Sequence, residues 1–160
     1  MTQARMPVNG TDAAVQIRPL ERADRDAWRG LWTAYLGFYQ STVTEDVYTT
    51  TFERLLGDDP HDFNGLVAEH NGQLVGLTHY VFHRHAWKIE NVCYLQDLYA
   101  TPETRGTGVG RALIEAVYDA ADQAKVPTVY WMTQEDNATA RQLYDRIGSL
   151  TNFIKYQRPV

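Results

Sequence analysis

The run from Arg105 to Gly110, Arg-Gly-Thr-Gly-Val-Gly, combines residue types and a position that suit anion binding. The residues before it, 92–100, are rich in β-branched, aromatic and aliphatic side chains, which favours a strand. After it, apolar residues recur at helical spacing through residues 109–124. Glycines leave the amides of the first helical turn uncovered, and the helix dipole adds partial positive charge there. The run therefore predicts a site for a phosphate or pyrophosphate group.

The spacing of the glycines separates this run from two common phosphate-binding motifs. A dinucleotide-binding fingerprint needs Gly-x-Gly-x-x-Gly and an acidic residue about 20 positions later, whereas these glycines lie two and two apart. A P-loop needs Gly-x-x-x-x-Gly-Lys followed by Ser or Thr, and the chain has no such run. What remains is Arg-x-x-Gly-x-Gly, at Arg105, Gly108 and Gly110, at the start of a helix. A tight strand–helix turn without a ligand stays the alternative.

Two further motifs accompany this run in a fixed order. Residues 94–99, Tyr-Leu-Gln-Asp-Leu-Tyr, precede it, and residues 137–140, Asn-Ala-Thr-Ala, follow it together with Tyr144. The three motifs together resemble the GCN5-related N-acetyltransferase (GNAT) superfamily, and most of all its polyamine and small-amine acetyltransferases, including the fungal histone/polyamine type. The resemblance extends from Val15 to Arg158. It implies an α/β (α+β) GNAT fold, in which a mixed, mostly antiparallel, splayed central sheet is flanked by about four helices.

The resemblance implies that acetyl-CoA, as cosubstrate, contacts three parts of the chain. The backbone at a strand end would contact the pantetheine arm, the glycine-rich turn would bind the pyrophosphate, and the last helix would add a pantetheine contact and an acid. The residues implied are Leu98, Tyr99, Ala100, Arg105, Gly106, Thr107, Gly108, Val109, Gly110, Arg111, Asn137 and Tyr144. Without the resemblance, Asn137 is interpreted as a helix cap and the two arginines as solvated side chains at a helix start.

Transfer of an acetyl group from a thioester to an amine defines what such a site must supply. An alkyl amine with a pKa near 10 is neutral in only about one part in 1,000 at pH 7, which costs roughly 4 kcal/mol. The leaving thiol has a pKa of about 8.5 by analogy with cysteine, so an acid with a pKa of about 10 can protonate it as charge develops. The resemblance gives this catalytic role to Tyr144, whereas the residues alone favour a core tyrosine in an apolar helical stripe. No activated nucleophile is visible, so we expect direct transfer without a covalent acyl-enzyme.

Gln96 and Asp97 stand where polyamine-type relatives often carry Glu-Asp. Gln96 cannot accept a proton, and adjacent strand residues face opposite ways, so only one of the two can line a cleft on a regular strand. Asp97 is therefore the predicted carboxylate of the site, either anchoring the amine or relaying its proton through water. A structural aspartate bonded to neighbouring backbone is the alternative. Glu135 is a second candidate for contact with the amine.

Aromatic residues of the first two helices and their link are predicted to line the acceptor site. They are Trp32, Tyr35, Phe38 and Tyr39, whose rings can hold a cation. We expect at least one of Trp32 and Tyr35 to be a core residue instead.

Three histidines, His79, His83 and His85, raise the question of a metal site. No cysteine or carboxylate ligand set accompanies them at zinc-like spacing, so no metal is predicted. One of these histidines is instead a candidate for bordering the acceptor cleft.

Length, charge and composition set the broad class. We expect a disordered leader at residues 1–13 and a single domain over residues 14–160. A net charge of −5 argues against nucleic-acid binding and suits a cationic substrate. No apolar stretch has the length of a membrane span or the form of a secretory signal, so we expect a cytoplasmic protein without a membrane partner. The one cysteine, Cys93, is expected to be buried and inert.

The expected order of elements is strand, two helices, three strands, helix, strand, helix, strand. Asp24 is an expected helix N-cap, and Asn71-Gly72 predicts a hairpin turn. In the last part of the chain a strand is expected at residues 128–132, a helix at 138–147 and a closing strand at 153–157. Because the closing strand is short, its completion by a second copy of the chain in a homodimer stays open.

These observations predict an acetyl-CoA-dependent N-acetyltransferase that moves the acetyl group directly to the primary amine of a small molecule, namely a polyamine, a diamine or an amino acid. A protein or histone lysine is the alternative acceptor. A CoA-binding sensor without catalytic activity is a second alternative, disfavoured because Tyr144 and Asn137 are both present. A plain nucleotide-binding α/β domain is disfavoured by the glycine spacing.

Overall fold

The computed structural model describes residues 14–160, and the predicted disordered leader lies outside the described residues. The described chain divides into two compact units, residues 14–130 and residues 131–160, each of which is treated by itself. Within residues 14–160, no helix combines the length and the apolar character needed to cross a membrane.

The first unit is built on a five-stranded sheet with the order β1-β2-β3-β4-β5. The first three pairings are antiparallel and the pairing of β4 with β5 is parallel, which confirms the predicted mixed, mostly antiparallel sheet. Asn71 and Gly72 have φ of +50° and +75° in the turn between β2 and β3, as the predicted hairpin requires. The strands are β1 (Gln16–Pro19), β2 (Asn64–His70), β3 (Gln73–His83), β4 (Val92–Ala100) and β5 (Val129–Tyr130).

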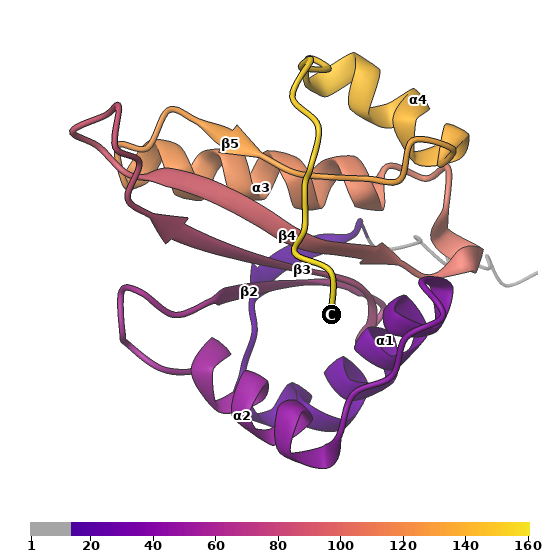
Figure 1. Ribbon diagram of the computed structural model, residues 1–160. Coiled ribbons are helices and arrows are strands. Elements are labelled where there is room, and N and C mark those ends of the chain that lie inside the picture. The colour runs from indigo at the N-terminus through magenta and orange to yellow at the C-terminus, as the bar shows by residue number, and fades with distance from the viewer. Residues whose placement is uncertain (1–13) are drawn as a thin grey trace, which may run out of the picture. The chain divides into compact units, whose positions relative to one another are not determined.

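Helices cover both faces of this sheet (Figure 1). α1 (Arg25–Phe38) and α2 (Glu45–Leu55) pack against one face, and α3 (Val109–Gln123) packs against the other. Adjacent residues of a strand point to opposite faces of the sheet and contribute to different clusters. Val67 packs in the cluster with α1 and α2, whereas Ala68 packs in the cluster with α3. The first cluster is rich in large rings, including Trp28, Trp32, Tyr48 and Phe52.

The strands β4 and β5 separate soon after they pair. Their register contains only Cys93 with Val129 and Tyr94 with Tyr130, so the strand predicted at residues 128–132 is shorter than expected. Within residues 14–130, no strand pairs with the β5-facing edge of β4 beyond Tyr94. The predicted splay of the sheet is therefore present at this edge.

A β-bulge at Gln96 interrupts the pairing of β4 with β3. Tyr80 lies opposite Leu95 while His79 lies opposite Asp97, which leaves Gln96 as the extra residue. Gln96 is exposed and Asp97 is buried. The bulge therefore sets which β3 residue faces Asp97, and that residue is His79.

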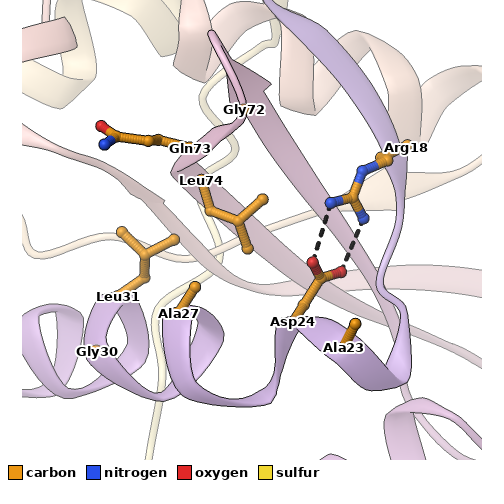
Figure 2. A pocket seen from close by; sticks show the side chains of 9 residues that line it. All are labelled: Arg18, Ala23, Asp24, Ala27, Gly30, Leu31, Gly72, Gln73 and Leu74. Carbon is orange, nitrogen blue, oxygen red and sulfur yellow. Dashed lines mark hydrogen bonds and ion pairs between the residues drawn. The ribbon is translucent and has the colours of Figure 1, made fainter.

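Asp24 lies at the N-cap position of α1, but its side chain does not cap the helix as predicted. The short 3-10 helix η1 (Arg22–Asp24) runs directly into α1, and the φ and ψ of Asp24 are helical, unlike those of an ordinary N-cap. Its carboxylate instead accepts hydrogen bonds from Arg18 at 2.7 and 2.9 Å and from the amide of Glu21 at 2.8 Å. Figure 2 shows Arg18 and Asp24 at one side of a shallow pocket beside the Gly72 turn.

The second unit contains α4 (Ala138–Ile147), at the bounds expected from the sequence. The closing strand predicted at residues 153–157 is wrong, because this segment has no regular structure. Phe153, Ile154 and Tyr156 are 81, 76 and 90% exposed, and the part of the chain that the structure describes offers this segment no pairing strand. Aromatic and aliphatic residues alone do not make a strand when no neighbouring backbone satisfies its hydrogen-bonding groups.

Replacement of Gly76 by alanine should destabilise the protein by about 1–3 kcal/mol through overpacking. A Cβ at this position in β3 would lie 2.9 Å from the carbonyl oxygen of Tyr99, 3.0 Å from Val109 and 3.1 Å from Leu113. Urea unfolding measures the change in the free energy of unfolding. Gly30→Ala is the matched control, because nothing lies within 4 Å of a Cβ there, and helix propensity should raise stability by about 0.5–1 kcal/mol. Equal stability of Gly76→Ala and the wild type would contradict the close approach of β3 and α3.

Candidate functional site

The glycine-rich turn follows β4 and begins α3. Gly106 and Gly108 have φ of +80° and +91°, left-handed conformations that glycine adopts without strain. Gly108 is the N-cap of α3, and its carbonyl accepts the first helical bond from the amide of Ala112 at 2.9 Å. Several backbone amides of the turn and of the first helical turn donate to no acceptor among residues 14–160. They are the amides of Gly106, Gly108, Val109, Gly110 and Arg111. These amides can therefore bind an anion supplied from outside the chain.

The two arginines of the turn differ in how they are placed. Arg111 forms an ion pair with Glu115, with 2.7 Å between Nε and the carboxylate oxygen. Arg105 lies over the end of β4, where its Nε donates to the carbonyl of Ala100 at 3.4 Å and its guanidinium lies 5.9 Å from the ring centre of Tyr99. Arg105 is thus the arginine whose charge lies closer to the strand end.

The open edge of β4 presents backbone groups of alternate residues. The amide of Thr101 donates to the carbonyl of Val75 at 2.8 Å, so this residue is hydrogen-bonded to β3. Because backbone groups alternate sides along a strand, Leu98 and Ala100 direct their amides and carbonyls away from β3. Tyr99 lies between them and directs its backbone toward Leu77. Of the three predicted pantetheine contacts, Leu98 and Ala100 have the outward backbone.

Asp97 lies at the centre of a buried polar cluster between β4 and α1. It is 6% exposed. Its Oδ2 accepts hydrogen bonds from Nδ1 of His79 at 2.8 Å and from Nε1 of Trp32 at 3.2 Å. Its backbone carbonyl accepts from the hydroxyl of Thr78 at 2.8 Å. A buried carboxylate needs such donors, because a buried charge without hydrogen bonds is strongly destabilising.

Three tyrosine hydroxyls are affected by the charge of Asp97. Burial first, then the negative charge of Asp97 and a hydrogen bond to it, raise the pKa of Tyr35 well above its ordinary value. Burial and the charge of Asp97 also raise the pKa of Tyr39. For Tyr94 the pKa is raised by burial, by Tyr130 and by Asp97. Asp97 is therefore surrounded by neutral phenol groups from α1, from the residue after α1 and from β4.

The predicted aromatic residues of the acceptor site occupy two environments. Trp32 is 7% exposed, belongs to the core and stacks on Trp28 with 5.2 Å between ring centres, so it is the core member expected from the pair Trp32 and Tyr35. Tyr39 and Phe38 are 36 and 54% exposed, with ring centres 5.1 Å apart. Tyr35 is half-buried, and its ring centre lies 5.2 Å from that of Tyr39. The accessible aromatic surface near Asp97 is thus that of Tyr35, Phe38 and Tyr39.

Sequence reasoning did not assign His79 and Tyr94 to the neighbourhood of Asp97. The sequence predicts only that one of His79, His83 and His85 borders the acceptor cleft, because the pairing of His79 with Asp97 depends on the bulge at Gln96. His83 lies elsewhere, with its Nε2 2.8 Å from the hydroxyl of Tyr130. In residues 14–160, no group of three or more metal-ligating side chains is placed to hold a metal ion.

Asn137, Tyr144 and Glu135 belong to the second unit. The side chain of Asn137 caps α4, because its Oδ1 accepts from the amide of Ala140 at 3.4 Å, and its Nδ2 donates to the hydroxyl of Thr133 at 3.1 Å. Tyr144 is half-buried on α4, with its ring 5.5 Å from that of Trp131 in an edge-to-face contact. Glu135 is exposed just before the helix.

Comparison with known proteins identifies similar sequences and folds. The model of the Acetyltransferase (GNAT) family matches residues 26–148. The D-amino-acid N-acetyltransferase HPA3 of Saccharomyces cerevisiae is 37% identical over 145 residues, which cover 90% of this chain and 90% of that protein. The thialysine N-epsilon-acetyltransferase of Bos taurus is 33% identical over 81 residues, which cover 48% of this chain and 44% of that protein.

A solved structure with a similar fold is that of the aminoglycoside N-acetyltransferase AAC(6')-Iy in complex with CoA. It has a TM-score of 0.81 and 18% sequence identity, and the match covers 96% of this chain and 99% of that chain. At this identity the similarity concerns the fold.

Replacement of Tyr35 by phenylalanine should reduce the loss of stability at alkaline pH. Because the pKa of Tyr35 is raised in the fold, the unfolded chain loses this proton near pH 10 while the folded chain keeps it. The free energy of unfolding therefore falls as pH rises above 10, by up to about 1.4 kcal/mol per pH unit for this group. Urea unfolding between pH 9 and pH 11, within about a unit of the ordinary tyrosine pKa, should show a smaller slope for the variant.

Tyr156→Phe is the control for this measurement, because Tyr156 is 90% exposed. An equal slope in Tyr35→Phe and the wild type, or an equal change in both variants, would contradict the burial of the Tyr35 hydroxyl beside Asp97.

Proposed function

The chain belongs to the Acetyltransferase (GNAT) family, and from this premise we propose that its acceptor is the primary amine of a small molecule. The GNAT fold, N-acetyltransferase activity and the use of acetyl-CoA as cosubstrate, all expected from the sequence, are confirmed by this membership. The proposed acceptors are polyamines, diamines and amino acids. The relatives named for acetylation of D-amino acids and of thialysine support this class, since both are small molecules with a primary amine.

One observation carries the proposal for the acceptor, namely the buried carboxylate of Asp97 among aromatic rings. An ammonium group is recognised by a carboxylate and by the faces of aromatic rings. The side-chain partners of Asp97 are the indole of Trp32 and the imidazole of His79, and no arginine or lysine of residues 14–160 forms an ion pair with it. We propose that Asp97 attracts the acceptor's ammonium group and that Tyr35, Phe38 and Tyr39 contact its carbon chain.

The residues proposed for acetyl-CoA fit its chemistry. The free amides of Gly106 and of Gly108 to Arg111, together with Arg105, suit a diphosphate, because they combine donors with the positive end of the α3 dipole. The amide of Thr107 donates to the carbonyl of Thr104 instead. The open edge at Leu98 and Ala100 suits the amide groups of pantetheine, which can pair with it as an added strand does. Asn137 is proposed as a further pantetheine contact, a role that leaves its Oδ1 on the helix cap.

The proposed reaction is a direct transfer. The neutral amine nitrogen attacks the thioester carbonyl carbon and forms a C–N bond, the C–S bond breaks, and the nitrogen loses one proton. The thiolate takes up a proton, for which we propose the phenol of Tyr144 as donor. The nitrogen gives its proton to water, and the phenolate regains one from water, so the protons balance. Asp97 is proposed to hold the ammonium form and to pass its proton to water, and Glu135 is the second carboxylate candidate. Asp97 thus acts on the amine, and Tyr144 acts on the thiol.

An assay of thiol release from acetyl-CoA across an amine panel tests the proposal. The panel contains spermidine, a diamine, D- and L-amino acids, and a histone-tail peptide. We expect turnover with at least one small amine to exceed that with the peptide. Preference for the peptide would contradict a small-molecule acceptor, and tight binding of acetyl-CoA without any turnover would favour the sensor alternative.

Asp97→Asn keeps the shape of the side chain and removes its charge. Within this assay it therefore separates binding of the amine from binding of acetyl-CoA. The KM of the amine should rise by about tenfold or more, because a charge-assisted contact is lost. The affinity for acetyl-CoA, measured by calorimetry, should stay near the wild-type value. An unchanged amine KM would remove Asp97 from the acceptor site.

Tyr144→Phe should lower kcat by about 100- to 10,000-fold, the usual contribution of a general acid. The Kd for acetyl-CoA should change little, because the ring of Tyr144 is retained. Steady-state kinetics and calorimetry make the comparison, and Tyr118→Phe on α3 is the control with an expected wild-type kcat. If Tyr144→Phe turns over at the wild-type rate, another group protonates the thiolate.

A further inference from the structure

A buried chain of hydrogen bonds links α1 to Asp97 through β3. Nε1 of Trp28 lies 2.9 Å from Nε2 of His79, and Nδ1 of His79 lies 2.8 Å from Oδ2 of Asp97. The three residues are 1, 3 and 6% exposed, respectively. The chain therefore lies out of solvent along its whole length.

The chemistry of the end groups fixes the tautomer of the histidine. An indole nitrogen can only donate, so Nε2 of His79 has to be the acceptor and carries no proton. The one proton of the neutral ring is then on Nδ1, from which it is donated to Asp97. A protonated ring would place an N–H on Nε2 against the N–H of Trp28. Trp28 thus selects the neutral, Nδ1-protonated form of His79.

Several contacts hold this cluster in place. The ring of His79 lies 6.0 Å from that of Trp28 and 5.7 Å from that of Trp32, in tilted and edge-to-face arrangements. The hydroxyl of Thr78 bonds the backbone of Asp97. The titratable groups that face the cluster are Asp97 and Tyr94 from β4, Tyr35 from α1, Tyr39 after α1, and Tyr48 from α2, whose ring is edge-on to Trp28 and Trp32.

We propose that His79 is a positioning residue of the acceptor site, held by Trp28 as the neutral Nδ1–H tautomer so that Asp97 keeps a fixed orientation and a full negative charge. This proposal rests on the role proposed for Asp97 as the group that attracts the acceptor's ammonium. An imidazolium at His79 would pair with Asp97 and compete with the ammonium. The bond from Trp28 prevents that competition, and His79 orients the carboxylate without contacting the acceptor.

The state of His79 can be tested without any assay of activity. Nitrogen NMR of the full-length protein labelled at its histidines reports which ring nitrogen carries a proton, and the signal lost in His79→Asn gives the assignment. We expect the wild type to show a neutral ring with its proton on Nδ1 and none on Nε2. A proton on Nε2 would overturn the proposal.

Trp28→Phe removes the donor and keeps an aromatic ring, so His79 becomes able to take a second proton. The amine KM should then rise as pH falls below the new imidazole pKa, by about tenfold per pH unit, because only the neutral form leaves Asp97 available. The Kd for acetyl-CoA should show no such dependence. Parallel pH profiles of amine KM for the variant and the wild type would contradict the proposal.

Two substitutions at position 79 separate positioning from packing. His79→Leu fills the space without a donor and should raise the amine KM by about tenfold, whereas His79→Asn restores an N–H toward Asp97 and should recover most of that loss. Equal KM values in the two variants, both folded by circular dichroism, would show that the donor is irrelevant. If no amine is a substrate, the proposed function fails while the NMR result still decides the tautomer.

Discussion

A carboxylate buried between a strand and a helix is the constraint on which this site depends. Asp97 is 6% exposed, and burial of a charge is tolerated only where hydrogen-bond donors converge on it. Those donors come from two different elements, Trp32 on α1 and His79 on β3. Their convergence requires α1 to pack at one place along the sheet, which the cluster of large rings around Trp28 and Phe52 secures. The hydrophobic core and the polar cluster around Asp97 thus specify the same position of α1 on the sheet.

Strand β4 carries groups proposed for the cofactor and a group proposed for the acceptor, and its geometry keeps those roles apart. One edge of the strand pairs with β3, and the other edge has no partner strand within residues 14–130 beyond Tyr94, where β5 separates from it. The outward backbone of Leu98 and Ala100 lies on that open edge. The side chain of Asp97 points instead to the α1 face, and the glycine-rich turn follows the end of the strand. Cofactor and acceptor contacts can therefore belong to one strand without competing for the same surface.

Local sequence patterns were sufficient to predict several elements of the fold and of the candidate site. The glycine-rich turn, the Asn71-Gly72 hairpin and α4 are set by nearby residues, and all three are found where the sequence places them. The pairing of His79 with Asp97 could not be predicted, because it depends on a one-residue bulge at Gln96 that no local pattern signals.

Segments whose structure depends on distant partners were also predicted poorly. The strand at 128–132 shortens to Val129–Tyr130, because its pairing with β4 ends there. The residues at 153–157 include aromatic and aliphatic side chains that favour a strand, yet no partner strand in the described chain pairs with them. Asp24 has the sequence context of a cap, but the cation of Arg18, brought near by β1, determines where its carboxylate points.

The two buried aspartates of the first unit show why Asp97 differs from a structural carboxylate. Asp24 is bound by Arg18 through two hydrogen bonds (Figure 2). These hydrogen bonds hold the pKa of Asp24 below its ordinary value. An ion pair of this kind satisfies both charge and hydrogen bonding, so nothing at Asp24 is left for a ligand to provide. At Asp97 the partners are an indole and an imidazole, which satisfy hydrogen bonding, and no arginine or lysine of residues 14–160 forms an ion pair with it. An ammonium group would supply Asp97 with the positive charge that Arg18 supplies to Asp24. This difference in partners is the physical reason to place the acceptor's cation at Asp97.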